Sequence, residues 1–281
     1  MSIAIVYDQT LIYSNGFGKM NITDPNSPAP TGDSIFRIGS CTKLFTALAI
    51  SQLVPKMPQG FETPLANYYA SQGLNIINPY SSSPSSPSSQ ITFRQVLSQL
   101  SGLQRETPCG GTLFCTWTQQ QVFSALNNSE LILPPYSLPS YSNLGFALVG
   151  NLIPSIVGLS YEAYLQQNIL NPLGMSNTGY TITQQVLNQM VPSYYLGYLI
   201  NSDYSLGWNG PAGQMFAFVS PFISSICLLS FLTFPFSFHH QVQLGKWFGK
   251  IDFGSSANKF FCFKLCFWSH NHQRNGLPHV Y

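Results

Sequence analysis

The sequence predicts a mixed fold of the α+β class, and three observations lead to it. Residues 3–7 and 11–18 have the apolar content of two strands, and Asp8-Gln9-Thr10 between them has the length of a hairpin turn. Residues 42–54 and 160–170 carry apolar side chains at helical spacing. Hydrophobic residues make up 44% of the chain, enough for a sizeable core. We therefore expect an N-terminal antiparallel hairpin that packs with helices.

Turn-forming residues separate the remaining predicted elements. Residues 21–32 are rich in Pro, Asn, Ser and Thr and predict a loop. Further helices are predicted over residues 95–100, 119–127 and 143–157, the last interrupted by Pro154. The Ser/Pro-rich tract at residues 81–89 cannot pack a core, so it predicts a flexible surface insertion.

Charge is scarce in this chain. Only 7% of the residues are charged, against roughly a quarter in an ordinary globular domain, and the formal net charge is +2. This composition favours a secreted or membrane-associated protein, and without a basic run it does not predict a nucleic-acid partner. Residues 1–8 lack the features of a signal peptide, and a chain that begins inside a strand leads us to expect an earlier, missing segment.

Cysteine placement leaves one question open. Cys109 and Cys115 flank the pair Gly110-Gly111, so a local disulfide is one interpretation in an oxidising compartment. The alternative is two reduced thiols in a loop. The six cysteines of the chain do not decide between the two.

The C-terminal quarter differs in character from the rest. Residues 216–238 are almost free of charge, and their length approaches that of a transmembrane helix. They also contain Pro221 and Pro235, so a membrane span and sequence unrelated to the preceding domain stay open as alternatives. The tail at residues 239–281 has no usable periodicity and stays unassigned. Its His270-Asn271-His272 has no zinc ligand at a suitable spacing beside it, so no metal is predicted.

The sharpest chemical feature is Ser40-Cys41-Thr42-Lys43. At the start of a helix, residues three apart share a face, which brings the Lys43 amine near the Ser40 hydroxyl. A serine hydroxyl becomes a good nucleophile when a neighbouring base takes its proton. A lysine can be that base where burial or a nearby cation lowers its pKa. The alternative is an N-cap serine followed by a solvated lysine.

The context of this tetrapeptide resembles one known family. Residues 36–50, FRIGSCTKLFTALAI, resemble the nucleophile helix of the serine β-lactamase-related family, which includes class C β-lactamases and penicillin-binding proteins. Residues 91–103, ITFRQVLSQLSGL, resemble a second family segment, with Gln99 where histidine is usual. Tyr141-Ser142-Asn143 matches the Tyr-x-Asn motif, and residues 160–164, 169–175 and 210–213 also match in order.

This resemblance implies a site, a fold and an absence of cofactors. Ser40 is expected to attack a carbonyl and form an acyl-enzyme, with Lys43 as base, Tyr141 as proton carrier and Asn143 as a substrate-binding or Lys43-orienting residue. For this role an adjacent positive charge must favour the Tyr141 anion. The alternative interpretation of Tyr141 is a half-buried aromatic residue. The alternative interpretation of Asn143 is a helix N-cap. The implied fold is β-lactamase/transpeptidase-like: an antiparallel sheet packed with helices, a mainly helical subdomain over residues 53–170, and a site between them. The matching domain covers residues 1–215 and is partial.

One expected motif is not found. The family carries Lys-Thr-Gly or His-x-Gly on a late strand, and neither occurs in a suitable setting after Gly213. Losing an oxyanion donor costs about 100–1000-fold in rate. Two functions therefore stay open: a cofactor-independent serine hydrolase acting on a small-molecule or peptide substrate at an amide, ester or peptide bond, and a catalytically inactive binding or scaffold protein. The membrane-anchored protein is a third.

Overall fold

The computed structural model describes residues 1–7, 10–82, 90–109, 114–195, 198–200, 202–218 and 261–263. Several sequence predictions lie wholly or largely outside these ranges. They are the turn at Asp8-Gln9, the Ser/Pro-rich tract from residue 83 to 89, the apolar segment beyond residue 218, and the tail apart from residues 261–263.

The chain divides into two compact units. Of the described residues, one unit contains those within Met1–Phe36 and Thr183–Asp203 together with Phe218 and Phe261–Phe263, and the other contains those within Arg37–Ile182 and Tyr204–Ala217. We call them the sheet unit and the helical unit. The subdomain expected over residues 53–170 is therefore larger in the structure, because it also takes in the first long helix and a late segment.

The sheet unit is built on the N-terminal hairpin. β1 (Ser2–Tyr7) pairs antiparallel with β2 (Thr10–Gly16), which confirms the predicted hairpin, and β9 (Phe261–Phe263) pairs on the other edge of β1. Alternate residues of β1 are buried, as expected for a strand with one face on a core. The unit also contains α8 (Gln184–Gln189) and a second hairpin, β6 (Ser193–Tyr195) with β7 (Tyr198–Ile200).

Two further short strands, one early and one late in the chain, pair with each other. β3 (Ile35–Arg37) and β8 (Phe216–Phe218) are hydrogen-bonded neighbours. The residues of β8 are all buried, so the apolar segment that begins at residue 216 starts as a strand. Among the described residues no single helix is long and apolar enough to cross a membrane. The helical segments 143–157 and 161–170 reach the required length and hydropathy only when taken together, and a bend of 80° separates them.

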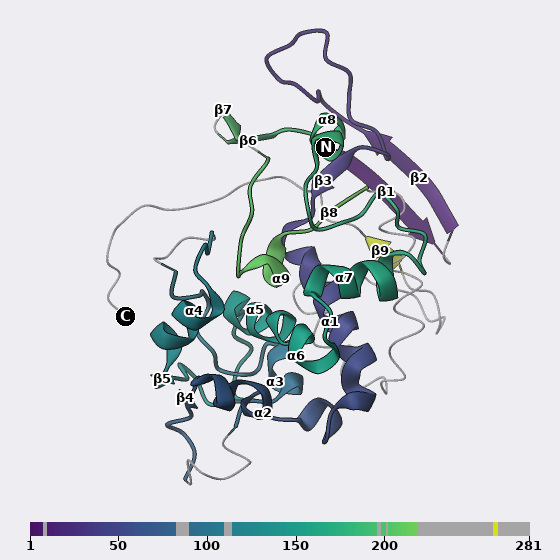
Figure 1. The fold of residues 1–281 in the computed structure, drawn as a ribbon. Helices are drawn as coiled ribbons and strands as arrows, with labels where there is room; N and C mark the ends of the chain where they lie inside the picture. The colour runs from purple at the N-terminus through teal and green to yellow at the C-terminus, as the bar shows by residue number, and fades with distance from the viewer. Residues whose placement is uncertain are drawn as a thin grey trace. The chain divides into compact units, whose positions relative to one another are not determined.

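The helical unit consists of short helices around two longer ones (Figure 1). Its α-helices are α1 (Thr42–Leu53), α2 (Ala66–Tyr69), α3 (Phe93–Leu97), α4 (Gln119–Leu126), α5 (Asn143–Asn151), α6 (Ile153–Val157), α7 (Tyr161–Leu165) and α9 (Gly210–Gly213). A π-helical segment, η6 (Gln166–Leu170), continues α7, and β4 (Ile76–Ile77) pairs in parallel with β5 (Ser129–Glu130).

The core of this unit lies between α1, α5 and α9. On α1 the side chains of Phe45, Leu48 and Leu53 are buried, and on α5 residues 144–150 are all buried. A helix that is apolar all round is expected at the centre of a domain. The short α9 contacts both α1 and α5, which Figure 1 shows as neighbouring coils. This packing brings the late segment against the helix that follows Ser40.

Helix ends follow capping residues more closely than apolar spacing. The predicted helix at 95–100 begins at Phe93, because a capping box precedes it. The Thr92 side chain accepts a hydrogen bond from the main-chain N–H of Gln95, and the Gln95 side chain accepts one from the main-chain N–H of Thr92. It ends at Leu97, and Gln99 then adopts a left-handed φ of +60°. The predicted break near Pro154 is confirmed, since Pro154 lies in the first turn of α6.

Substitution of Gly150 by alanine should destabilise the helical unit. A Cβ at Gly150 would lie 2.2 Å from the Cβ of Pro211 on α9, so one of the two helices would have to move. We expect the free energy of unfolding to fall by about 1–3 kcal/mol, as for other overpacked cores. Chemical denaturation measures this loss, with Ser124→Ala on the exposed face of α4 as the control. Equal stability of the two variants would contradict this packing.

Candidate active site

Ser40 occupies the turn that leads into α1. It lies in the 3₁₀ turn η1 (Gly39–Cys41), directly before Thr42, and it is exposed. Gly39 has a φ of +50°, a conformation that L side chains rarely adopt, so glycine suits this position. The expectation that Ser40 lies where a loop becomes a helix is confirmed.

Lys43 is buried on the first turn of α1, with 7% of its surface exposed. Its Nζ lies 3.4 Å from Ser40 Oγ, 2.7 Å from Asn143 Oδ1 and 2.7 Å from the carbonyl oxygen of Ala212. The alternative of a solvated lysine is therefore wrong. A neutral amine can donate two hydrogen bonds and keeps one lone pair. With Asn143 and Ala212 as the two close acceptors, a neutral Lys43 would have that lone pair left for Ser40, whereas a protonated Lys43 donates to Ser40 Oγ at 3.4 Å.

Tyr141 completes the surroundings of the Ser40 hydroxyl. Its phenol donates to Ser40 Oγ at 2.6 Å, and 36% of its surface is exposed. Lys43 Nζ lies 4.7 Å and Arg105 Cζ lies 5.0 Å from the centroid of the Tyr141 ring. The Ser40 oxygen thus accepts a hydrogen bond from Tyr141.

Both polar atoms of the Asn143 side-chain amide have hydrogen-bond partners. Its Oδ1 accepts from Lys43, while its Nδ2 donates to the two carboxylate oxygens of Glu106 at 3.0 and 2.9 Å. The interpretation of Asn143 as the helix N-cap is wrong by one position. Ser142 caps α5, because its Oγ accepts from the Gly145 amide at 2.9 Å. The Asn143 side chain is therefore available to Lys43.

Burial controls the protonation of the two titratable groups beside Ser40. It lowers the pKa of Lys43 from 10.5 to about 7; Glu106 raises that pKa, Arg105 lowers it and Cys41 raises it, each by a smaller amount. For Tyr141, burial raises the pKa and outweighs the hydrogen bond to Ser40 and the charge of Arg105. The structure therefore differs from the expectation of a favoured Tyr141 anion: Tyr141 stays a phenol at neutral pH.

Three groups that position these side chains were not predicted from the sequence. Gln99 stands where histidine is usual. Its side-chain oxygen Oε1 accepts a hydrogen bond from the main-chain N–H of Ser142 at 2.7 Å, and its main-chain carbonyl accepts one from the main-chain N–H of Ser140 at 2.8 Å. Glu106 had no assigned role. Ala212 belongs to the recognised segment 210–213, but its carbonyl had no predicted partner.

Hydrogen bonds from α1 hold Ala212 in place. Thr46 Oγ1 donates to the carbonyl of Pro211 at 2.7 Å, and Thr42 Oγ1 accepts from the Met215 amide at 3.1 Å. Both threonines are fully buried. The same helix thus carries Lys43 and the residues that fix its carbonyl partner.

A disulfide joins Cys109 to Cys115, which answers the question left open by the sequence. Cys115 is also hydrogen-bonded to the segment before α9: its amide donates to Leu206, and its carbonyl accepts from Trp208. The bridge therefore links the segment that follows Glu106 to the chain that leads to Ala212.

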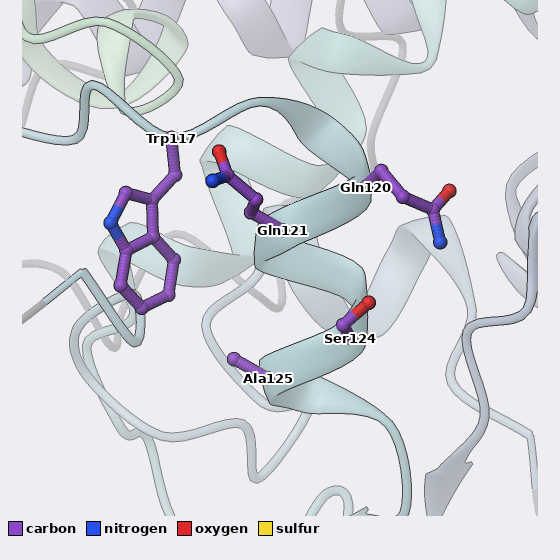
Figure 2. A pocket seen from close by; sticks show the side chains of 5 residues that line it. All are labelled: Trp117, Gln120, Gln121, Ser124 and Ala125. Atoms are coloured by element: carbon purple, nitrogen blue, oxygen red, sulfur yellow. The ribbon is translucent and has the colours of Figure 1, made fainter.

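One surface hollow does not coincide with this site. It measures about 540 Å³ and lies against α4, lined by Trp117, Gln120, Gln121, Ser124 and Ala125. In Figure 2, Trp117 and Gln121 lie on one side of the helix, and Gln120 points away from them. None of these residues contributes a base or an acid, and none belongs to the group around Ser40. Geometry and chemistry therefore favour the Ser40 cluster as the candidate active site.

Solved structures share this fold. The crystal structure of a β-lactamase/D-alanine carboxypeptidase from Yersinia pestis, complexed with citrate, matches with a TM-score of 0.66 and 25% identity, over 80% of this chain and 61% of that chain. The α+β class and the β-lactamase/transpeptidase type of fold are confirmed. The chain therefore has a fold of the serine-hydrolase type.

The family follows from a direct match. The family model described as Beta-lactamase matches residues 1–220, so the chain belongs to the β-lactamase family. It is 34% identical over 221 residues to Beta-lactamase-like protein 2 of Dictyostelium discoideum, covering 76% of this chain and 39% of that protein. It is 30% identical over 219 residues to Putative beta-lactamase-like 1 of Homo sapiens, covering 77% of this chain and 43% of that protein.

The chain thus spans about two fifths of the length of these two relatives. The sequence prediction that the third family motif is missing concerns residues after Gly213. Most of these residues, from 219 onwards except 261–263, lie outside the described part of the chain. The same holds for the histidines considered as metal ligands.

Proposed function

We propose that this protein is a serine hydrolase that forms an acyl-enzyme through Ser40. One observation carries the proposal: Ser40 Oγ lies within reach of both a buried amine at 3.4 Å and a phenol at 2.6 Å. The amine is the base available at neutral pH, because burial lowers the pKa of Lys43 to about 7 and leaves part of it unprotonated, while burial raises the pKa of Tyr141 and keeps its proton in place. A base with a pKa near the working pH is best suited to general base catalysis.

The proposed acylation begins with Ser40. Its oxygen attacks the substrate carbonyl carbon as its proton moves to Lys43 Nζ, so that the carbonyl oxygen becomes an oxyanion and Lys43 an ammonium. When this intermediate collapses, the bond to the leaving group breaks and the phenol of Tyr141 protonates the leaving atom. The Lys43 ammonium then returns a proton to Tyr141. The products are the Ser40 ester and the protonated leaving group, and water releases the acyl group in the reverse sequence.

In this proposal Asn143 and Ala212 position the Lys43 amine and take no part in making or breaking bonds. They accept hydrogen bonds at 2.7 Å from the Lys43 amine and fix its direction. Both acceptors also stabilise the ammonium that forms when Lys43 takes the proton, because an ammonium can keep both bonds and add a third to Ser40. The partner is a small-molecule or peptide substrate with an amide, ester or peptide bond. The Yersinia pestis protein, a β-lactamase/D-alanine carboxypeptidase by its description, supports this range.

Covalent labelling tests the proposal. The purified chain is incubated with a fluorescent penicillin and, separately, with a fluorophosphonate ester, and the intact mass is measured. We expect a mass increase of one acyl or phosphonyl group on the wild type and none on Ser40→Ala. Circular dichroism of both proteins provides the control for folding.

The alternative, an inactive binding or scaffold protein, predicts the opposite result. A chain that is folded by circular dichroism, yet forms no adduct with either reagent, would rule out the nucleophile proposed here for this polypeptide. Labelling that persists in Ser40→Ala would show that another side chain reacts.

A further inference from the structure

The amide of Asn143 is useful to Lys43 in only one of its two orientations. Lys43 Nζ is a donor, so the amide must present Oδ1 rather than Nδ2. An amide is free to adopt either orientation unless its hydrogen-bond partners select one. Here Nδ2 faces both oxygens of the Glu106 carboxylate, at 3.0 and 2.9 Å. Reversal would set an oxygen against that carboxylate and an NH₂ group against the lysine, which is unfavourable at both ends.

We propose that Glu106 is a positioning residue, which acts through Asn143 by turning the amide oxygen toward the Lys43 amine. Neither the family motifs seen in the sequence nor the roles proposed above include this residue. The inference rests on the proposed function for its activity readout, but its structural readout is independent of catalysis.

The segment that contains Glu106 also forms main-chain hydrogen bonds with α5. The Arg105 carbonyl accepts from the Asn143 amide at 2.7 Å and from the Leu144 amide at 3.3 Å. These amides lie in the first turn of α5 and have no partner within the helix. Asn143 is therefore fixed by the side chain of Glu106 and by the main-chain carbonyl of the preceding residue, Arg105.

Arg105 and Glu106 form an ion pair of opposite charges close to the base. Arg105 Nε lies 3.1 Å from Glu106 Oε1, with 65% of the Arg105 side chain and 33% of the Glu106 side chain exposed. Glu106 raises the pKa of Lys43 and Arg105 lowers it. In the described part of the chain, the other titratable groups that face the amine are the Cys41 thiol beside Ser40 and the Tyr141 phenol. From α9 the Ala212 carbonyl faces it, and from α5 Asn143 and the Phe146 ring.

Two substitutions of this pair should therefore shift the titration of Lys43 in opposite directions. Removing the negative charge in Glu106→Gln should move the midpoint to lower pH, because the ammonium loses a favourable neighbour. Removing the positive charge in Arg105→Met should move it to higher pH. Titration of the ¹³Cε resonance of Lys43 in a lysine-labelled chain measures both shifts, and the resonance is assigned by its loss in Lys43→Met. Glu130→Gln, the same change on the exposed strand β5, is the matched control and should leave the midpoint unchanged.

Activity separates positioning from charge. In Glu106→Ala the Asn143 amide loses its partner, and the labelling rate above the pH midpoint should fall by about 10–100-fold, as for a misplaced reacting group. Glu106→Gln keeps one oxygen to accept from Asn143, so it should recover most of that rate while keeping the shifted midpoint.

The outcomes are distinct for the two proposals. If the wild type forms no adduct, the proposed function fails, and the NMR titration still decides the role of Glu106. If Lys43 titrates at the same pH in the wild type, Glu106→Gln and Arg105→Met, or shifts in the same direction in both variants, the inference is overturned. It is also overturned if the wild type labels and Glu106→Ala labels at the same rate.

Discussion

Replacement of Lys43 by methionine should slow the acylation of Ser40 by about 10²–10⁴-fold, the usual contribution of a general base. Methionine has a similar length and fits a buried site, but it cannot take the serine proton. The variant also leaves Asn143 Oδ1 and the Ala212 carbonyl without the donor that each has at 2.7 Å. A modest loss of stability should accompany the loss of rate, so labelling must be compared at a temperature where both proteins are folded.

The pH dependence of the wild type gives an independent measure of the same base. Acylation needs the neutral amine, and burial lowers the pKa of Lys43 to about 7. The rate should therefore rise with pH through about 7 and level off above it, with a tenfold loss for each pH unit further below the midpoint. Lys43→Met should lack this acid limb. A rate that keeps rising toward pH 10 would instead indicate a base with an ordinary lysine or tyrosine pKa.

The comparison with Lys43→Arg sharpens this experiment. Arginine stays protonated at any pH that the protein survives, so it can donate to Asn143 and Ala212 but cannot act as a base. If Lys43 only held the site together, arginine would retain much of the rate. If Lys43 takes the proton, both variants should be slow, and the rate of neither should rise near pH 7.

One local pattern, together with the family resemblance, predicted the residues around Ser40. Ser40 and Lys43 lie three residues apart on one helix turn, and Tyr141 and Asn143 are neighbours in a short motif at the start of another. The hairpin and the long helices were likewise visible as apolar periodicity. Such features depend on spacing within a few residues, which a single sequence displays directly.

The groups that support the site were not predictable in this way. Ala212 is 169 residues from Lys43, and Glu106 is 37 residues from Asn143. The direction of the Tyr141 pKa was missed because it depends on burial, which only the packed structure defines. Short elements such as α2 and β4 were missed as well, since they have too few residues to show a period and depend on tertiary partners.

Substitution of Tyr141 by phenylalanine should have an effect that depends on the leaving group. The ring and its contacts with Lys43 and Arg105 are retained, and only the hydroxyl that donates to Ser40 Oγ at 2.6 Å is lost. An amide nitrogen must be protonated as it leaves, so hydrolysis of an amide or a β-lactam should fall by about 10²–10⁴-fold. A nitrophenolate leaves as a stable anion, so acylation by a nitrophenyl ester should fall much less.

The contrast between the two substrates identifies the role of the phenol. If Tyr141 took the Ser40 proton, both substrates would slow equally in Tyr141→Phe, because the attack step is common to them. If Tyr141 donates to the leaving atom, only the amide slows strongly. Burial raises the pKa of Tyr141 and lowers that of Lys43, and these opposite shifts favour the second outcome: a neutral amine is ready to accept a proton at the pH where the phenol still holds one to give.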